Sequence, residues 1–239
     1  MDQPFINCSV CGERNSRFAP ECASCGNFLR DKVANIDLFP TLSGLADDPA
    51  VTFDRIIFAE NKNFTSFLFT FGVLKFFFLG YLISFHFLGL EGDGILLIYG
   101  RFMLVLVLTL LLPYLIHAIL PSLRGTLLWR DIAAGFSYAM TPVALSALIM
   151  IFLEFVIYGS FLFSRNPSPA DFQQMFGVIF LLLESGFLIW TVFLFAVFMG
   201  RLTGKTLLSI LLSVTFMMIM FALNLGVINF LSSQNLGIE

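Results

Sequence analysis

Five long apolar stretches constrain the fold of this chain more than any other feature. Each reaches or approaches the roughly 20 apolar residues that a helix needs to cross a hydrocarbon core of about 30 Å. Barrel strands are excluded because they alternate at every second residue, whereas these stretches are apolar nearly throughout. The sequence therefore predicts five transmembrane helices within residues 62–232, at about Phe64–Leu88, Phe102–Leu120, Ile132–Ile157, Phe172–Met199 and Leu207–Leu231.

Charged side chains are concentrated ahead of these stretches. Residues 1–62 hold 15 of the 29 charged side chains, although they make up about a quarter of the chain. Only 12% of all residues are charged, against roughly 25% in a typical soluble domain. The hydrophobic share of 58% excludes a disordered chain, and the net charge of −3 argues against a nucleic-acid ligand. We expect an all-α integral membrane protein with a polar N-terminal part.

All four cysteines lie in that polar part. Cys8 and Cys11 form one C-x-x-C pair, Cys22 and Cys25 form a second, and a glycine follows each pair. Two such pairs supply the four thiolates of a tetrahedral zinc site, and glycine accepts the positive φ of a tight turn. We expect a zinc ribbon over residues 1–30 that holds one structural zinc ion. Two disulfides or redox chemistry are alternatives, disfavoured by a reducing cytoplasm and by the lack of a strand–helix unit.

The segment between the cysteines and the first apolar stretch divides in two. Residues 31–48 are expected to be a linker that is ordered in part at most. Asp48 followed by Pro49 is a typical helix start, and Val51, Phe53 and Ile56 follow at helical spacing. We expect a short amphipathic helix over residues 49–60 at the cytoplasmic interface, serving either as a structural lead-in or as a docking helix for a partner.

Positively charged loops predict the orientation in the membrane. Arg124 and Arg130 lie between the second and third stretches, and Arg201 and Lys205 lie between the fourth and fifth. The opposite loops are mainly acidic, with Arg165 among them. Because lysine and arginine are enriched in cytoplasmic loops, the N-terminus is expected in the cytoplasm and the C-terminus outside. The N-terminal residues are too polar to resemble a signal peptide.

Two charged side chains are expected near the middle of the bilayer. Lys75 lies 11 residues into the first stretch, about 16 Å deep at 1.5 Å per residue, and Glu184 lies at a depth that differs by only a few Å. The depths predict a Lys75–Glu184 contact. Charged groups in hydrocarbon are costly, so the contact is either a helix-packing ion pair or part of an ion or substrate path.

Other polar and helix-breaking residues are expected to have structural roles. Arg101 and Glu154 are expected near the outer face, where they form a peripheral pair or, more plausibly, snorkel to water. Pro113 and Pro142 are expected to kink the helices that contain them. His86 and His117 are expected at the membrane interfaces, and phenylalanine-rich runs such as residues 76–78 are expected to face lipid.

Two segments resemble known families. The four-cysteine segment is similar to the short zinc ribbons at the N-termini of many prokaryotic membrane proteins. Residues from about Asp48 to Phe230 resemble the Yip (Ypt-interacting protein) domain family, through PAVTFDRII at 49–57, GFSYAMTP at 135–142 and the five-span layout with a cytoplasmic N-terminus. The resemblance implies a bacterial or archaeal branch and a location in the cytoplasmic membrane.

The expected function is a non-enzymatic membrane scaffold or adaptor. The chain lacks G-x-S-x-G, H-E-x-x-H and a phosphate-binding glycine loop. The zinc ribbon and the interfacial helix would recruit a protein partner on the cytoplasmic side or in the membrane, and the Yip resemblance implies a role in membrane organisation or trafficking. The alternative is a transport accessory subunit or small transporter that uses Lys75 and Glu184. The sequence does not determine whether the chain forms an oligomer.

Overall fold

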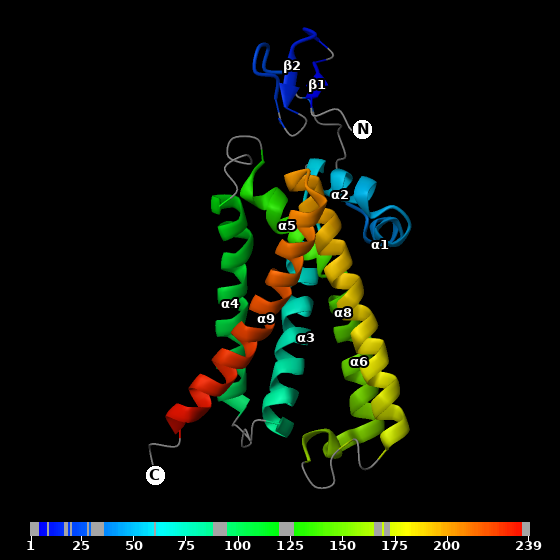
Figure 1. Cartoon of the computed structure of the whole chain (residues 1–239), viewed down its shortest axis with the longest axis vertical. Coiled ribbons are helices and arrows are strands. Elements are labelled where there is room, and N and C mark those ends of the chain that lie inside the picture. The colour runs from blue at the N-terminus through cyan, green and yellow to red at the C-terminus, as the bar shows by residue number, and fades with distance from the viewer. Residues whose placement is uncertain are drawn as a thin grey trace. The chain divides into compact units, whose positions relative to one another are not determined.

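Helices make up most of the described chain. The computed structural model describes residues 5–8, 10–16, 19, 21–27, 29, 36–59, 61–87, 95–119, 127–164, 169 and 173–235. Within these residues, five helical segments are long and apolar enough to cross a membrane. They are α3 (Thr65–Phe87), α4 (Ile95–Ile119), α6 (Thr141–Tyr158) continued by the 3-10 helix η2 (Gly159–Phe163), α8 (Gln174–Thr203) and α9 (Thr206–Asn235) (Figure 1). The predicted all-α bundle is confirmed, and the five spans fit an integral membrane protein.

The third span begins later than predicted. The expected stretch from Ile132 to Ile157 is divided into α5 (Trp129–Ala139) and α6, with a turn at Met140. Pro142 stands in the first turn of α6, where its missing N–H would have had no helical partner. The prediction of a kink at Pro142 inside one continuous helix was therefore wrong: the proline begins a new helix.

The second span begins seven residues earlier than predicted, at Ile95, and contains Pro113 in its interior. The helix is one element on both sides of this proline. Predicted loops at residues 91–94, 121–125 and 165–168, which include Arg124 and Arg165, lie outside the described residues.

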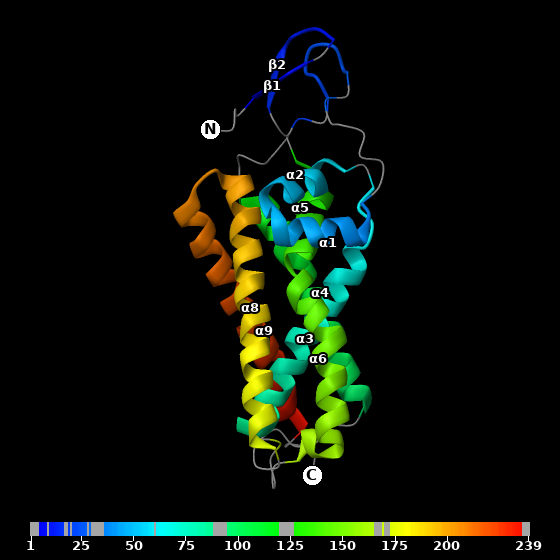
Figure 2. The same ribbon diagram turned by 90° about the vertical axis from the view of Figure 1, so that its right-hand side faces the viewer.

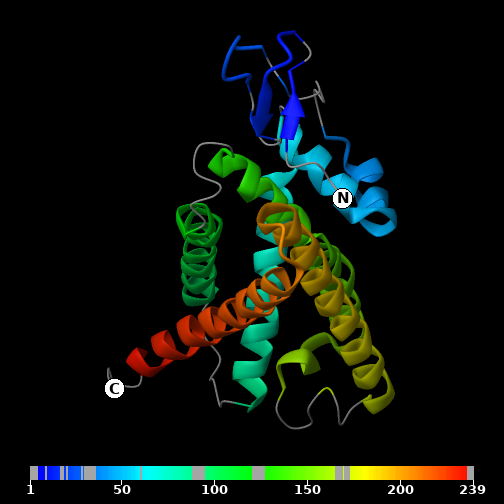
Figure 3. The same ribbon diagram turned by 45° about the horizontal axis from the view of Figure 1, so that its top comes forward.

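The chain divides into two compact units. One unit consists of Met1–Thr65 and Leu112–Phe136, and the other consists of Ser66–Leu111 and Ser137–Glu239. In the second unit α8 packs against α6 and against α9 (Figure 2). Helices α8 and α9 meet at a short junction and diverge from it (Figure 3). Gly204 ends α8 there with φ of 67°, a left-handed conformation that glycine adopts without strain.

Phenylalanine residues in α3 pack inside the second unit rather than facing lipid. Phe76 and Phe77 are 0% and 5% exposed. The Phe76 ring contacts Phe221 edge to face with the centroids 5.5 Å apart, and the Phe77 ring contacts Phe102 at 5.7 Å. The expectation that residues 76–78 face lipid was wrong for these two residues, because hydrophobicity alone does not distinguish a lipid-facing ring from a buried one.

The predicted linker contains a helix. Helix α1 spans Leu38–Asp47, although residues 31–48 were expected to be ordered in part at most. Pro40 is compatible with this helix because it lies in the first turn. Leu45 is buried, and Gly44 lies so close to α2 that a β-carbon there would be 2.5 Å from Thr52 Oγ1. Packing against α2 (Pro49–Phe58) therefore orders a segment whose own sequence signal is weak.

Helix α2 begins at Pro49, as the sequence predicts. The Asp48 carboxylate accepts a hydrogen bond from the Val51 N–H at 3.2 Å and so caps the helix. Its apolar face, which includes Phe53 and Ile56, is buried within the protein. This helix is amphipathic, but the apolar face is covered by neighbouring elements of the chain.

Lys62 joins the end of α2 to the start of α5. Its ammonium group donates to the carbonyl oxygens of Ile56 and Ile57, both at 2.6 Å. It also forms an ion pair with Asp131 at 3.2 Å, and Asp131 accepts from the Leu128 N–H. Lys62 thus connects the last turn of α2 to α5 within the first unit.

Candidate functional site: a four-cysteine cluster and a buried charge cluster

The four cysteines come together as the spacing predicts. Their Sγ atoms all lie within 4.8 Å of one another. Cys8 Sγ is 3.6 Å from Cys25 Sγ, and Cys11 Sγ is 3.5 Å from Cys22 Sγ, so each contact joins one C-x-x-C pair to the other. All four thiols are free of disulfides.

The two pairs have the same backbone geometry. The Gly12 N–H donates to the Cys8 carbonyl at 2.9 Å, and the Gly26 N–H donates to the Cys22 carbonyl at the same distance. Both glycines adopt positive φ, 74° and 69°, which confirms their role in the turns. Strand β1 (Phe5–Asn7), just before the first pair, and β2 (Arg14–Ser16), between the pairs, form a short antiparallel ladder. The repeated turn aims the two sulfurs of each pair at a common point.

Asn15 supports the cluster from β2. Its side-chain N–H donates to Cys22 Sγ at 3.4 Å and to the Glu13 carbonyl at 2.8 Å, while its Oδ1 accepts from the Ala23 N–H at 2.9 Å. The side chain is buried, with 5% exposure. Asn15 was missed at the sequence level because a single asparagine in a polar segment carries no spacing signal.

The Cys22 and Cys25 thiols have different pKa values because their hydrogen-bond partners differ. The backbone N–H of Cys25 lowers the pKa of the Cys22 thiol to about 6 against the opposing effect of burial. For Cys25, the backbone N–H of Asn27 acts to lower the pKa, but interactions with the Cys11, Cys8 and Cys22 thiols, together with burial, raise it to about 12. Four thiolates this close repel one another, so a bound cation is what allows all four to be ionised together.

The cluster can hold a metal ion. A tetrahedral ion with bonds of about 2.3 Å to sulfur places its sulfurs about 3.8 Å apart, close to the sulfur separations found here. Four protein ligands leave no open coordination position, which is typical of a structural rather than a catalytic site.

A second cluster lies among the spans. Lys75 on α3 is fully buried, and its ammonium group forms an ion pair with Glu184 on α8, as the depth argument expects. Glu184 also accepts from the Ser146 hydroxyl of α6 at 3.0 Å. Glu154 on α6 lies 4.0 Å from the same ammonium group. One cation therefore lies between two carboxylates from different helices.

The expected snorkelling of Arg101 and Glu154 does not occur. Arg101 is 0% exposed and Glu154 is 7% exposed. Glu154 extends toward Lys75 instead of toward the membrane surface. Counting residues from a span end placed Glu154 too far out, because the span was assumed to begin at Ile132 and it begins at Thr141.

The two histidines contact backbone carbonyls. His86 Nε2 lies 3.2 Å from the Leu162 carbonyl, and His117 Nε2 lies 3.2 Å from the Leu127 carbonyl. The described residues gather metal-type ligands at the four cysteines, and neither histidine belongs to that group.

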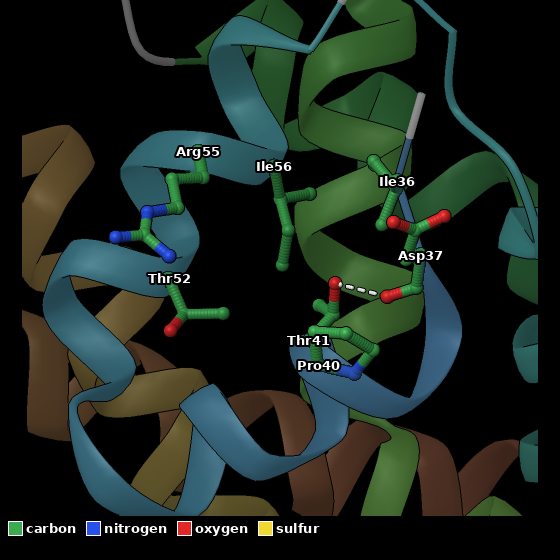
Figure 4. Close-up of a pocket in the computed structure, with 7 residues that line it drawn as sticks. All are labelled: Ile36, Asp37, Pro40, Thr41, Thr52, Arg55 and Ile56. Atoms are coloured by element: carbon green, nitrogen blue, oxygen red, sulfur yellow. Dashed lines mark hydrogen bonds between the residues drawn. The ribbon is translucent and has the colours of Figure 1, made fainter. Parts of the chain in front are cut away.

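A small pocket lies between parts of α1 and α2. It has a volume of about 120 Å³, and its lining includes Asp37, Thr41, Thr52 and Arg55 (Figure 4). The Thr41 hydroxyl donates a hydrogen bond to the Asp37 backbone carbonyl at 2.7 Å, so this hydroxyl already has a partner within the protein. Both helices belong to the same unit, so the cavity is a feature of this helix pair.

The chain has no match among known proteins by three comparisons: no family model, no curated protein and no solved structure matches it. The function is therefore inferred from the residues of the two clusters, and membership of the Yip family stays a prediction.

Proposed function

We propose that this chain is a non-enzymatic integral membrane adaptor whose N-terminal zinc ribbon docks a protein partner on the cytoplasmic side of a prokaryotic cytoplasmic membrane. The observation that carries the proposal is the convergence of four sulfurs in a unit of about 30 residues. Membership of the Yip family and a role in membrane organisation or trafficking belong to the same proposal.

Zinc is the metal that this donor set favours. Four thiolates in tetrahedral arrangement select zinc or an iron–sulfur centre, and paired C-x-x-C turns are typical of zinc ribbons. A unit this small buries little apolar surface, so metal binding supplies most of its folding free energy. The ion holds the ribbon together, and the ribbon surface makes the contact with the partner.

The ribbon presents apolar side chains on its surface. Phe5 is 47% exposed and Val10 is 69% exposed. The Arg14 guanidinium lies 4.6 Å from the centre of the Phe5 ring, a cation–π contact that limits the motion of the ring. Contiguous exposed apolar surface is typical of interaction sites, and we infer that Phe5 and Val10 contribute to such a surface.

Two variants separate the metal role from the docking role. Cys11→Ser should lower bound zinc from about one ion per chain to near zero and abolish partner binding, because four thiolates are needed to close the site. Val10→Ser should retain zinc but weaken partner recovery in crosslinking from native membranes. Phe39→Ser, which removes an 81% exposed apolar residue outside the ribbon, is the matched control. Zinc-free fresh protein, or a partner retained by Cys11→Ser, would refute the proposal.

The buried charge cluster supports a second candidate function. Lys75, Glu154 and Glu184 place three ionisable groups from three helices in one buried location, which in membrane proteins is typical of ion and substrate paths. A transport accessory subunit or small transporter would lose flux in Glu184→Gln while keeping its partners. An adaptor has no flux to lose, and it should lose its partner in Cys11→Ser but not in Glu184→Gln. The two variants together therefore distinguish the two functions.

A further inference from the structure

A hollow at the junction of α8 and α9 is used by neither proposed function. It has a volume of about 400 Å³, and its lining comes from both helices and from the short connection between them. All of it lies within the second unit. Because two membrane-spanning helices are joined there by only two residues, Gly204 and Lys205, the hollow opens at a membrane surface.

The end of the hollow at the junction is positively charged. Arg201 in the last turn of α8 and Lys205 in the connection both line it, and none of the described lining residues is acidic. Thr206, the first residue of α9, lines the same end, where a helix N-terminus directs unpaired N–H groups and a partial positive charge. This end is therefore suited to an anion.

The rest of the hollow is apolar. Phe193 and Val197 line it from one stripe of α8, and Ile210 lines it from α9. Phe193 lies ten residues before Thr203, about 15 Å along the helix, which is half of a hydrocarbon core of about 30 Å. The apolar wall thus runs from the surface to the middle of the bilayer.

Two glycines leave the floor of the hollow open. A β-carbon at Gly200 would meet no atom closer than Ser209 Oγ at 3.5 Å, and a β-carbon at Gly204 would meet nothing within 4 Å. Gly200 and Gly204 are spaced as G-x-x-x-G, but here their missing side chains create space beside α8.

We propose that this hollow binds one anionic phospholipid, with its phosphate between Arg201 and Lys205 and an acyl chain along Phe193 and Val197. A soluble phosphate would use the cations but not the apolar wall, whereas a neutral lipid would use the wall but not the cations. Only an anionic lipid uses both, and basic groups at a membrane surface attract such headgroups.

Trp190 provides a local probe of acyl-chain occupancy. It precedes Phe193 by one helical turn, on the same stripe of α8. The chain has two tryptophans, so Trp129→Phe leaves Trp190 as the single fluorophore. The full-length variant is reconstituted in phosphatidylcholine vesicles that contain a minor fraction of brominated phosphatidylglycerol. Quenching should exceed that from an equal fraction of brominated phosphatidylcholine, because the anionic lipid is enriched at the hollow.

Charge variants test the headgroup site. Lys205 is exposed, so Lys205→Gln should fold normally and lower the apparent affinity for phosphatidylglycerol about fivefold, and adding Arg201→Gln should bring the loss to about 25-fold. Arg130→Gln removes an exposed cation on the same predicted side of the membrane and should leave the affinity unchanged. Gly200→Ala, which fills the floor without changing charge, should also lower the enrichment.

Three outcomes would overturn the proposal. The first is equal quenching by the two brominated lipids. The second is an equal loss in Arg130→Gln, which would indicate general attraction of the membrane surface. The third is reversal of the enrichment by inorganic phosphate at constant ionic strength, which would indicate a site for a soluble anion rather than for a lipid.

Discussion

The ammonium group of Lys75 is fully buried, and its charge is balanced by side chains from two other helices. Glu184 contacts it directly, and Glu154 lies 4.0 Å away. The Ser146 hydroxyl holds the Glu184 carboxylate from its other oxygen. A buried charge that loses its partner is far more costly than the same charge in water, so the two carboxylates should contribute unequally to stability.

Glu184→Gln should therefore be more destabilising than Glu154→Gln. We expect Glu184→Gln to lower the free energy of unfolding by about 3 kcal/mol, because the close partner of Lys75 is lost. Glu154→Gln should cost about 1 kcal/mol or less, since the contact with Glu184 remains. Unfolding in mixed detergent micelles, followed by tryptophan fluorescence, measures both. Ser185→Ala, next to Glu184 and only half-buried, is the control. Equal effects of the two glutamine variants would contradict this account.

Gly44 shows how a single missing side chain sets helix packing. A β-carbon at this position would lie 2.5 Å from Thr52 Oγ1. Gly44→Ala should destabilise the pairing of α1 with α2 by about 1–3 kcal/mol, visible as faster proteolysis of residues 36–59. Adding Thr52→Ala should restore part of the loss by removing the clashing atom. Gly100→Ala, where a β-carbon would meet nothing within 4 Å, should be neutral or stabilising. If Gly44→Ala were proteolysed no faster than the parent protein, close packing of α1 on α2 would be contradicted.

At the scale of elements, the sequence predicted what depends on local pattern. Five apolar runs of sufficient length predicted the spans, and paired cysteine turns predicted the sulfur cluster. The start of α2 followed from Asp48 and Pro49, because an acidic cap and an early proline are both local signals.

The sequence did not predict features that depend on tertiary contacts. Helix α1 forms against α2, and no periodicity distinguished residues 38–47 from a linker. The break between α5 and α6 was hidden because most residues around Pro142 are apolar, so hydropathy continues across it. The position of Glu154 beside Lys75 followed from that break. The burial of Arg101 has no signal in the local sequence. The support of Cys22 by Asn15, seven residues away, depends on how the ribbon folds.

The cap of α2 provides a prediction at the same scale. Asp48→Ala should lower the stability of the α1–α2 pair by about 1 kcal/mol, because the Val51 N–H loses its acceptor. Asp48→Asn should retain most of the stability, since asparagine caps helices about as well. Hydrogen exchange at residues 50–52 reports the cap directly. Asp47→Ala, which replaces a neighbouring exposed acidic residue, is the control. If exchange at the start of α2 were faster in Asp47→Ala than in Asp48→Ala, the cap would be contradicted.

At the scale of the whole molecule, the described residues contain five helices that are long and apolar enough to cross a membrane. This odd number predicts that the residues before the first span and after the fifth lie on opposite sides of the membrane. Which side holds the ribbon decides whether its thiols stay reduced and able to bind zinc. The described basic residues that predict the orientation include Lys62 ahead of α3, Arg130 in α5, Arg201 in the last turn of α8 and Lys205 between α8 and α9.

The orientation can be measured with fusions to the C-terminal end in a bacterial host. Because lysine and arginine stay on the cytoplasmic side, a fused alkaline phosphatase should be active and a fused green fluorescent protein should be dark. In the inverse fusion, ahead of the ribbon, green fluorescent protein should fluoresce. Replacing Arg130, Arg201 and Lys205 together by glutamine should weaken this asymmetry, whereas replacing Lys75, which lies inside a span, should not. An active phosphatase ahead of the ribbon would place the cysteines in an oxidising compartment, where disulfides would displace the zinc site.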